Sequence, residues 1–86
     1  TMDRVFIAGK KYENLKFQDS APETGDYEPC TFVNCDFSNS SLAEMNFLEC
    51  EFRECNLSLT LLIQTSLREV KFINCKLLGL HFEECS

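Results

Sequence analysis

The chain has 86 residues, of which 44% are hydrophobic, with eight Lys and Arg against fourteen Asp and Glu and a formal net charge of −6. This length allows one domain with one narrow core, and the absence of a long apolar run or a secretion signal leads us to expect a soluble cytoplasmic protein. The acidic charge excludes direct binding to nucleic acid or to an anionic membrane, because both attract Lys and Arg.

Residues 1–29 are expected to form an N-terminal lead-in segment. A weak alternation of apolar residues over Met2–Phe17 fits a strand or an extended coil better than a helix. The stretch 18–29 contains four acids and no base, together with Pro22, Gly25 and Pro29. This composition predicts a solvated acidic loop.

From residue 30 onward, a bulky apolar residue occupies every fifth position. These central residues are Phe32, Phe37, Leu42, Phe47, Phe52, Leu57, Leu62, Leu67, Phe72, Leu77 and Phe82. Two positions before them lies a set of mostly smaller residues that includes Cys30, Cys35, Cys50, Cys55 and Cys75. A period of five matches neither one face of a straight α-helix nor one side of a flat strand. We therefore expect an all-β solenoid that turns a corner every five residues and encloses both sets of side chains.

The length of one coil can be read from self-similarity. At an offset of twenty residues, Cys35 matches Cys55 and then Cys75, and Phe32 matches Phe52 and then Phe72. An offset of fifteen gives only one matching pair of cysteines. Four sides per coil are therefore favoured over three.

The units CDFSN, MNFLE, CEFRE, CNLSL and CKLLG resemble those of the pentapeptide repeat family, over residues 30–86. The resemblance implies a right-handed quadrilateral parallel β-helix of about three coils, with the central residue and the smaller residue inside. Ala, the family's usual smaller residue, occurs at none of these positions here. Tyr12 and Phe17 fall in the same register, so residues 1–29 are interpreted as a lead-in segment or a degenerate coil followed by the acidic loop 18–29.

The six cysteines all occupy the smaller repeat position. One interpretation is a disulfide framework, since stacked cysteines one coil apart would be close enough to bridge. The other interpretation is a set of reduced, buried thiols, and we prefer it because the repeat dictates the spacing and no export signal is present. A zinc site is disfavoured, because parallel side chains do not converge on a tetrahedron and no Cys-x-x-Cys occurs.

No residues with an arrangement suited to catalysis stand out. The only histidine, His81, precedes a central Phe and is expected on the surface, and most Glu residues occupy outward repeat positions. Gly9-Lys10-Lys11 lacks the framework of a phosphate-binding loop. We therefore expect no enzyme activity, no cofactor and no metal site.

An outward apolar cluster suggests a protein-interaction or structural module. The cluster comprises Leu59, Leu61, Ile63 and Leu78, and a contiguous apolar group on a surface indicates a partner. The sequence also stops in mid-repeat at Ser86, which leaves a strand edge without a polar cap. Either the natural protein continues, or two copies form a homodimer through this C-terminal end.

An alternative function follows from the family resemblance. Its quinolone-resistance members are acidic β-helices that mimic DNA and bind DNA gyrase and related topoisomerases, so a gyrase or topoisomerase is a second candidate partner. Residues 30–86 hold eight acids and four bases. DNA carries about one charge per 1.7 Å, so the roughly 14 Å of this solenoid would need about eight net charges. The chain fits the first part of such a mimic better than a complete one.

Overall fold

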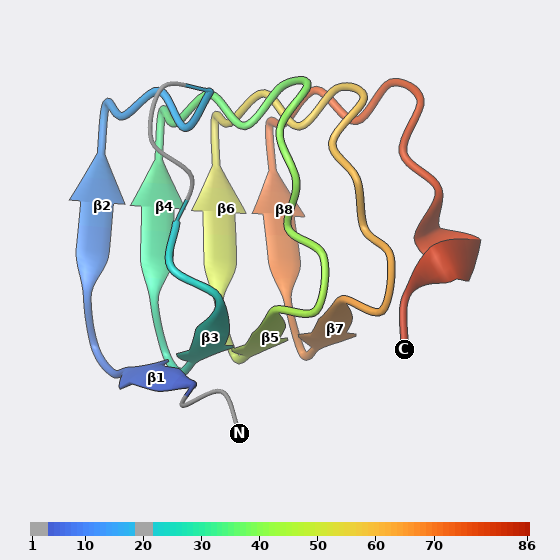
Figure 1. Cartoon of the computed structure of the whole chain (residues 1–86). Helices are drawn as coiled ribbons and strands as arrows, with labels where there is room; N and C mark the ends of the chain where they lie inside the picture. The colour runs from blue at the N-terminus through green and yellow to red at the C-terminus, as the bar shows by residue number, and fades with distance from the viewer. Residues whose placement is uncertain (1–3, 19–21) are drawn as a thin grey trace.

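The computed structural model describes residues 4–18 and 22–86, which wind into a β-solenoid (Figure 1). Its strands are β1 (Val5–Ile7), β2 (Lys11–Glu13), β3 (Gly25–Tyr27), β4 (Thr31–Val33), β5 (Asn46–Leu48), β6 (Glu51–Arg53), β7 (Ser66–Arg68) and β8 (Lys71–Ile73). A 3₁₀ helix, η1 (Phe82–Glu84), lies near the C-terminus. No α-helix occurs in the described ranges, and no helix there is long and apolar enough to cross a membrane.

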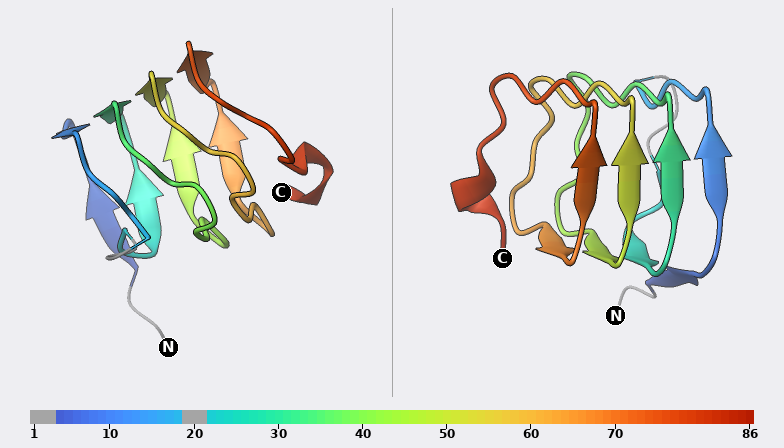
Figure 2. Two further views of the ribbon diagram at one scale, coloured as in Figure 1. Left: turned by 90° about the horizontal axis from the view of Figure 1, so that it is seen from above. Right: turned by 180° about the vertical axis from the view of Figure 1, so that it is seen from behind.

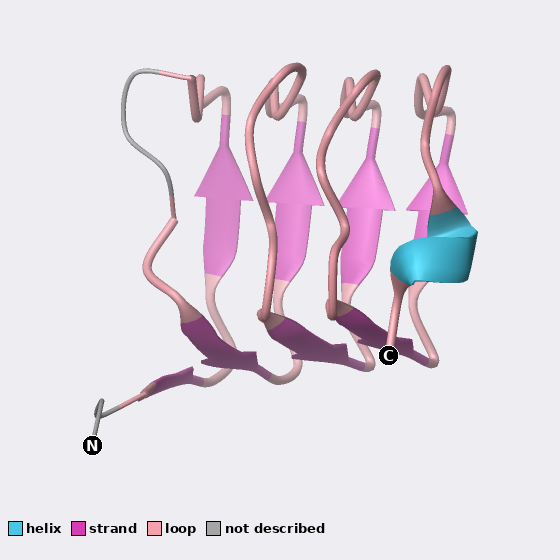
Figure 3. Cartoon of the chain, turned by 45° about the vertical axis from the view of Figure 1, so that its right-hand side comes forward, coloured by secondary structure: helices cyan, strands magenta, loops and turns pink. Residues whose placement is uncertain are grey.

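The strands form two parallel sheets that run along the solenoid axis (Figures 2 and 3). One sheet has the order β1-β3-β5-β7 and the other has the order β2-β4-β6-β8. Phe32 pairs with Phe52, and Phe52 pairs with Phe72, so each coil is twenty residues long. The predicted four-sided β-helix is therefore the observed fold.

The four sides of each coil are called faces 1–4. Face 1 is the β1-β3-β5-β7 sheet, face 2 is the β2-β4-β6-β8 sheet, face 3 comprises segments 16–18, 36–39, 56–59 and 76–79, and face 4 comprises segments 22–24, 41–44, 61–64 and 81–84. On faces 3 and 4 the segments end in turns. In the turn at residues 37–40, for example, Ser40 N donates to Phe37 O at 3.0 Å. These turns carry a positive φ at their third residue, as type II turns require.

The corners of the coil have a shared backbone conformation. The residue two positions after the central one has a positive φ at Gly9, Asn14, Asn34, Asn39, Glu44, Glu49, Glu54, Leu59, Gln64, Glu69, Asn74 and Gly79. Each left-handed residue turns the chain through a corner, so the next five residues lie along a new face. Most of these residues are not Gly, so the corners carry a conformational cost that the packed interior must offset.

The N-terminal segment differs from the prediction. Residues 18–29 were expected to be a loop, but residues Gly25–Tyr27 form β3, which lies between β1 and β5. Tyr27 is a central residue, 2% exposed, and its hydroxyl donates to the Glu23 carbonyl at 2.6 Å. A Cβ on Gly25 would lie 2.4 Å from the Val5 carbonyl oxygen, so only glycine allows the first two coils to approach here. Residues 19–21 of the expected loop lie outside the described residues.

The interior is filled by the two predicted sets of side chains. The buried central residues are Phe17, Tyr27, Phe32, Phe37, Leu42, Phe47, Phe52, Leu57 and Leu62, and the buried smaller residues include Cys30, Cys35, Cys50 and Cys55. Aromatic rings stack from coil to coil, with the Phe32 and Phe52 centroids 4.8 Å apart.

The last coil departs from the predicted core. Leu67, Phe72, Leu77 and Cys75 are only partly buried, because among the described residues a coil covers them on one side alone. Phe82 was predicted to be a core residue, but its side chain is 45% exposed. Helix η1 shifts the pairing by one residue, so Gln64 N donates to Glu84 O at 2.9 Å, whereas Glu44 N donates to Ile63 O. This shift and the uncovered side of the coil place Phe82 at the surface.

Candidate functional site

The interior cysteines and threonines form cross-coil hydrogen bonds. Thr65 Oγ1 donates to the Leu42 carbonyl at 2.7 Å, and Thr60 Oγ1 donates to the Phe37 carbonyl at 2.9 Å. The thiol of Cys55 reaches the Phe32 carbonyl at 3.3 Å in the same arrangement. A small side chain with one donor hydrogen can therefore bond across the coils at these sites, which suits Cys and Thr. The same repeat position also holds Met45, Val70 and Leu80, so the hydrogen bond is not required at every site.

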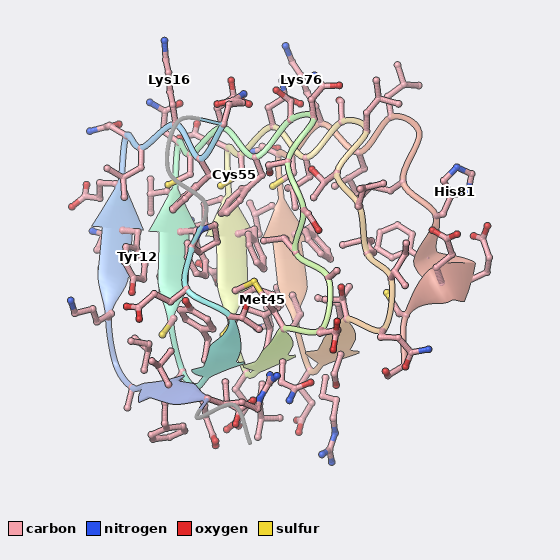
Figure 4. All side chains as sticks on the ribbon, viewed as in Figure 1. Tyr12, Lys16, Met45, Cys55, Lys76 and His81 are labelled. Atoms are coloured by element: carbon pink, nitrogen blue, oxygen red, sulfur yellow. The ribbon has the colours of Figure 1, made fainter. Side chains whose placement is uncertain are left out.

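All six cysteines are free thiols in the structure, and their surroundings disfavour reactivity in the middle coils. Burial raises the pKa of Cys50 to about 11 and that of Cys55 to about 12. The thiolate is the nucleophilic form, so these buried groups are expected to be inert near neutral pH. Figure 4 shows Cys55 inside the coil, while Lys16 and Lys76 point outward.

The predicted partner residues are exposed and lie at the junction of faces 3 and 4. Leu78 is 80% exposed, Leu59 is 57% exposed, and Leu61 and Ile63 are 52% and 47% exposed. Leu61 and Ile63 flank buried Leu62 on one segment of face 4. Leu59 N donates to the Leu78 carbonyl at 2.9 Å, so these two residues are adjacent across the coils. We call Leu59, Leu61, Ile63 and Leu78 the leucine patch.

Leu59 has an unfavourable backbone conformation for its side chain. Its φ is 59°, and within residues 4–18 and 22–86 it is the only aliphatic side chain at a positive-φ position, since the others are Asn, Glu, Gln and Gly. A Cβ on Gly79 would lie 2.6 Å from Leu59 Cδ2, so the leucine side chain lies directly over this glycine. Gly79 thus leaves room for Leu59 to cover the corner. A leucine that is both exposed and left-handed is costly, and such features concentrate at functional sites.

Acidic residues surround the leucine patch on face 4. Glu44 N donates to Ile63 O, which places Glu44 beside the patch on the preceding coil. Glu83 and Glu84 lie on the following coil, where His81 Nδ1 is 2.9 Å from a Glu83 carboxylate oxygen. The leucines were predicted from the sequence, but these acidic neighbours were not. Glu44 and Glu84 lie twenty residues before and after Gln64, and this spacing is the signal that indicates their position.

Arg4 is a further residue that sequence analysis did not single out. Its guanidinium donates to the Glu44 carbonyl at 2.8 Å and to the Gly25 carbonyl at 3.1 Å, and it forms an ion pair with Asp26 at 3.0 Å. Hydrogen bonds from Asn46 and Arg4 lower the pKa of Asp26. Arg4 therefore ties the start of the solenoid to two later coils, and its charge is already paired.

Groups suited to metal binding or catalysis do not gather in the part of the chain that is described. Within residues 4–18 and 22–86, no three His, Cys, Asp or Glu side chains lie together so that they could hold a metal ion. The hollows on face 2 are shallow and lined by residues such as Thr31, Val33, Arg53 and Ile73. His81 lies at the C-terminal end and points away from the solenoid in Figure 4.

The sequence matches one known protein family. A model of the pentapeptide repeat region matches residues 26–86, which is more than half of the chain. The chain belongs to the pentapeptide repeat family. Members of this family are generally non-enzymatic structural or interaction proteins. No curated protein matches the chain.

Proposed function

We propose that this pentapeptide repeat protein is a non-catalytic protein-interaction module that contacts its partner through the leucine patch. The observation that carries the proposal is that four aliphatic residues, Leu59, Leu61, Ile63 and Leu78, are exposed on adjoining segments of faces 3 and 4. Apolar patches of this kind mark protein contact surfaces, and a few fully desolvated residues supply most of the affinity in such contacts. The left-handed conformation of Leu59 adds support, because Asn, which occupies the equivalent corner at position 39, adopts it with less strain.

Site-specific photocrosslinking tests the proposal. A photoreactive phenylalanine at position 61 should give one defined crosslinked product in cells, and the same probe at position 31 on face 2 should not. The product should disappear when Ile63→Ser is added to the position-61 probe, because that change removes an adjacent anchor. A product that forms equally from both positions, or that survives Ile63→Ser, would contradict a specific surface.

The alternative is DNA mimicry directed at DNA gyrase or a related topoisomerase. The net charge of −6 and the solenoid shape support it. The charge falls short, however: four strand layers at about 4.8 Å spacing cover roughly 14 Å, where duplex DNA carries about eight charges, whereas the whole chain has a net charge of −6. The test is inhibition of gyrase binding to DNA by the purified chain. The interaction-module proposal expects no inhibition at micromolar concentrations.

We also propose self-association through the C-terminal end. Phe82 is 45% exposed, and Phe72 and Leu77 of the last coil are partly exposed at the same end. A second copy related by a two-fold axis would cover these side chains. Light scattering over a concentration series should show a dimer that Phe82→Glu abolishes. A protein that stays monomeric at high micromolar concentration would refute this assembly.

A further inference from the structure

Charge is segregated among the four faces of the solenoid. All eight Lys and Arg residues, which are Arg4, Lys10, Lys11, Lys16, Arg53, Arg68, Lys71 and Lys76, lie outside the face 4 segments. Face 4 instead carries Glu23, Glu44, Glu83 and Glu84, and all four are exposed. With no base on its described segments and His81 neutral, face 4 has a net charge of −4, which is most of the chain's −6. The remaining faces have acids and bases in nearly equal number.

The acidic groups lie on both sides of the leucine patch. Glu44 adjoins Ile63 through the bond from Glu44 N to Ile63 O at 3.0 Å, on the preceding coil. Glu84 adjoins Gln64 through the bond from Gln64 N to Glu84 O at 2.9 Å, on the following coil. The Leu61 and Ile63 part of the patch thus has acidic groups on the preceding and the following coil, and the guanidinium of Arg4, which donates to the Glu44 carbonyl, is paired with Asp26. Lys76 lies on face 3, two residues before Leu78.

We propose that face 4 binds a basic amphipathic segment of a partner protein, whose apolar side chains cover the leucine patch and whose Lys or Arg side chains meet the acidic rim. This inference rests on the proposed function and names the chemistry of the partner. Desolvated apolar anchors supply affinity, while opposite charges at the rim raise the association rate and select the partner.

The same charges argue against other occupants of face 4. Nucleic acid and anionic membranes would be repelled by four exposed carboxylates. A second copy that docked face 4 on face 4 would place like charges opposite each other, which is unfavourable for specific association. A neutral apolar segment would leave the carboxylates without partners at the edge of the contact. A basic amphipathic segment satisfies both the centre and the rim.

Three synthetic peptides of about 18 residues test this charge preference. They share Leu residues at helical i, i+3 and i+4 spacing and carry Lys, Gln or Glu at all other positions. Binding is measured by fluorescence anisotropy. The Leu/Lys peptide should bind about tenfold or more tightly than the Leu/Gln peptide, and the Leu/Glu peptide should not bind. Raising the salt from about 50 mM to about 500 mM should weaken Leu/Lys binding severalfold.

Matched variants locate the binding on face 4. Leu61→Ser with Ile63→Ser should weaken Leu/Lys binding about tenfold or more, whereas the control pair Phe6→Ser with Leu15→Ser, also exposed apolar residues, should leave it unchanged. Circular dichroism establishes that each variant keeps the β-solenoid.

A charge-matched pair of triple variants tests the acidic rim. Glu44→Gln, Glu83→Gln and Glu84→Gln together should remove most of the salt dependence. The control triple comprises Glu49→Gln, Glu54→Gln and Glu69→Gln, which are exposed corner residues away from face 4. The control removes the same charge and should have little effect.

The outcomes separate this inference from the proposed function. Equal binding of the Leu/Gln and Leu/Lys peptides, with both lost in the Leu61→Ser and Ile63→Ser variant, would overturn the preference for a basic partner and leave the interaction surface standing. Equal weakening by the two Glu triples would show nonspecific attraction and would overturn the inference. Failure of the Leu/Lys peptide to bind would overturn it as well. If the wild-type protein self-associates and the Leu61→Ser and Ile63→Ser variant does not, a second copy is the occupant of face 4. That result would also overturn the inference.

Discussion

The middle coils and the last coil have the same repeat but not the same burial. Phe32 and Phe52 are 1% and 0% exposed, whereas Phe72, in the same stack, is only partly buried. The residue type, the register and the ring stacking are alike, with centroids 4.8 Å and 5.3 Å apart. Only the number of covering coils differs. In a solenoid, the neighbouring coils therefore decide how much an interior side chain stabilises the fold.

The largest difference between the two regions should appear in core truncation. Phe52→Ala should lower the free energy of unfolding by about 3–5 kcal/mol, because it empties a site that is closed on both sides. Phe72→Ala should lower it by about half as much, because this side chain buries less surface on folding. Urea denaturation of both variants measures the two values. Equal losses would show that the last coil is covered as completely as the middle ones.

Thiol reactivity should distinguish the same two regions. In the native protein at pH 8, Cys75 and Cys85 should react with a thiol reagent about tenfold or more faster than Cys50 and Cys55. The middle thiols are buried, and burial raises the pKa of Cys50 to about 11 and that of Cys55 to about 12. Mass spectrometry of timed samples identifies which thiols are labelled. Uniform labelling of all four would contradict the closed interior.

After preparation without reductant, the denatured chain should show six reactive groups. Two or fewer would contradict reduced thiols and, with them, the expected cytoplasmic location.

The cross-coil hydrogen bonds should have a smaller effect. Thr65→Val keeps the shape of the side chain but removes the hydroxyl that donates to the Leu42 carbonyl, at a site that is 0% exposed. We expect a loss of about 1 kcal/mol in the free energy of unfolding. Thr31→Val, on the outer side of face 2, serves as the control and should change stability little. A Thr65→Val loss no larger than that of the control would mean that the bond contributes nothing.

The ion pair at the N-terminal coil should give the smallest effect, and it should depend on pH. Hydrogen bonds from Asn46 and Arg4 lower the pKa of the folded-state Asp26 carboxyl below its unfolded value of about 4. Its stabilisation is therefore complete above about pH 4 and is lost as the pH falls through the folded-state pKa. Asp26→Asn should be less stable than wild type at pH 6, and the gap should close near pH 2. A gap that is independent of pH would contradict this role.

The sequence predicted the register because eleven Phe and Leu residues recur without interruption from residue 32. It did not predict β3, because Tyr27 was not counted among them and the adjacent acids and prolines are typical of loops. Ile7, Tyr12, Phe17 and Tyr27 do share the spacing, and Pro22 is the only break. If Ile and Tyr are accepted as central residues beside Phe and Leu, the predicted solenoid extends towards the N-terminus.

The leucine patch was only partly predictable from the sequence. The exposed leucines follow from the repeat, because outward positions are known once the central ones are. The strain at Leu59 does not follow, since leucine gives no hint of a left-handed corner, whereas Asn39 at the equivalent corner does. The position of Phe82 could not be predicted either. Helix η1, which shifts the pairing so that Gln64 N donates to Glu84 O, has no side-chain cap that would mark it in the sequence.

The central claim is that the leucine patch is kept for binding at a cost to stability, and Leu59→Asn tests it most directly. Urea titration of this variant and of wild type, with and without the Leu/Lys peptide, measures both quantities at once. We predict that Leu59→Asn is more stable than wild type by about 0.5–1 kcal/mol without peptide and gains little from adding it, whereas wild type gains clearly. A variant that is less stable than wild type, or that gains as much from the peptide, would contradict the claim.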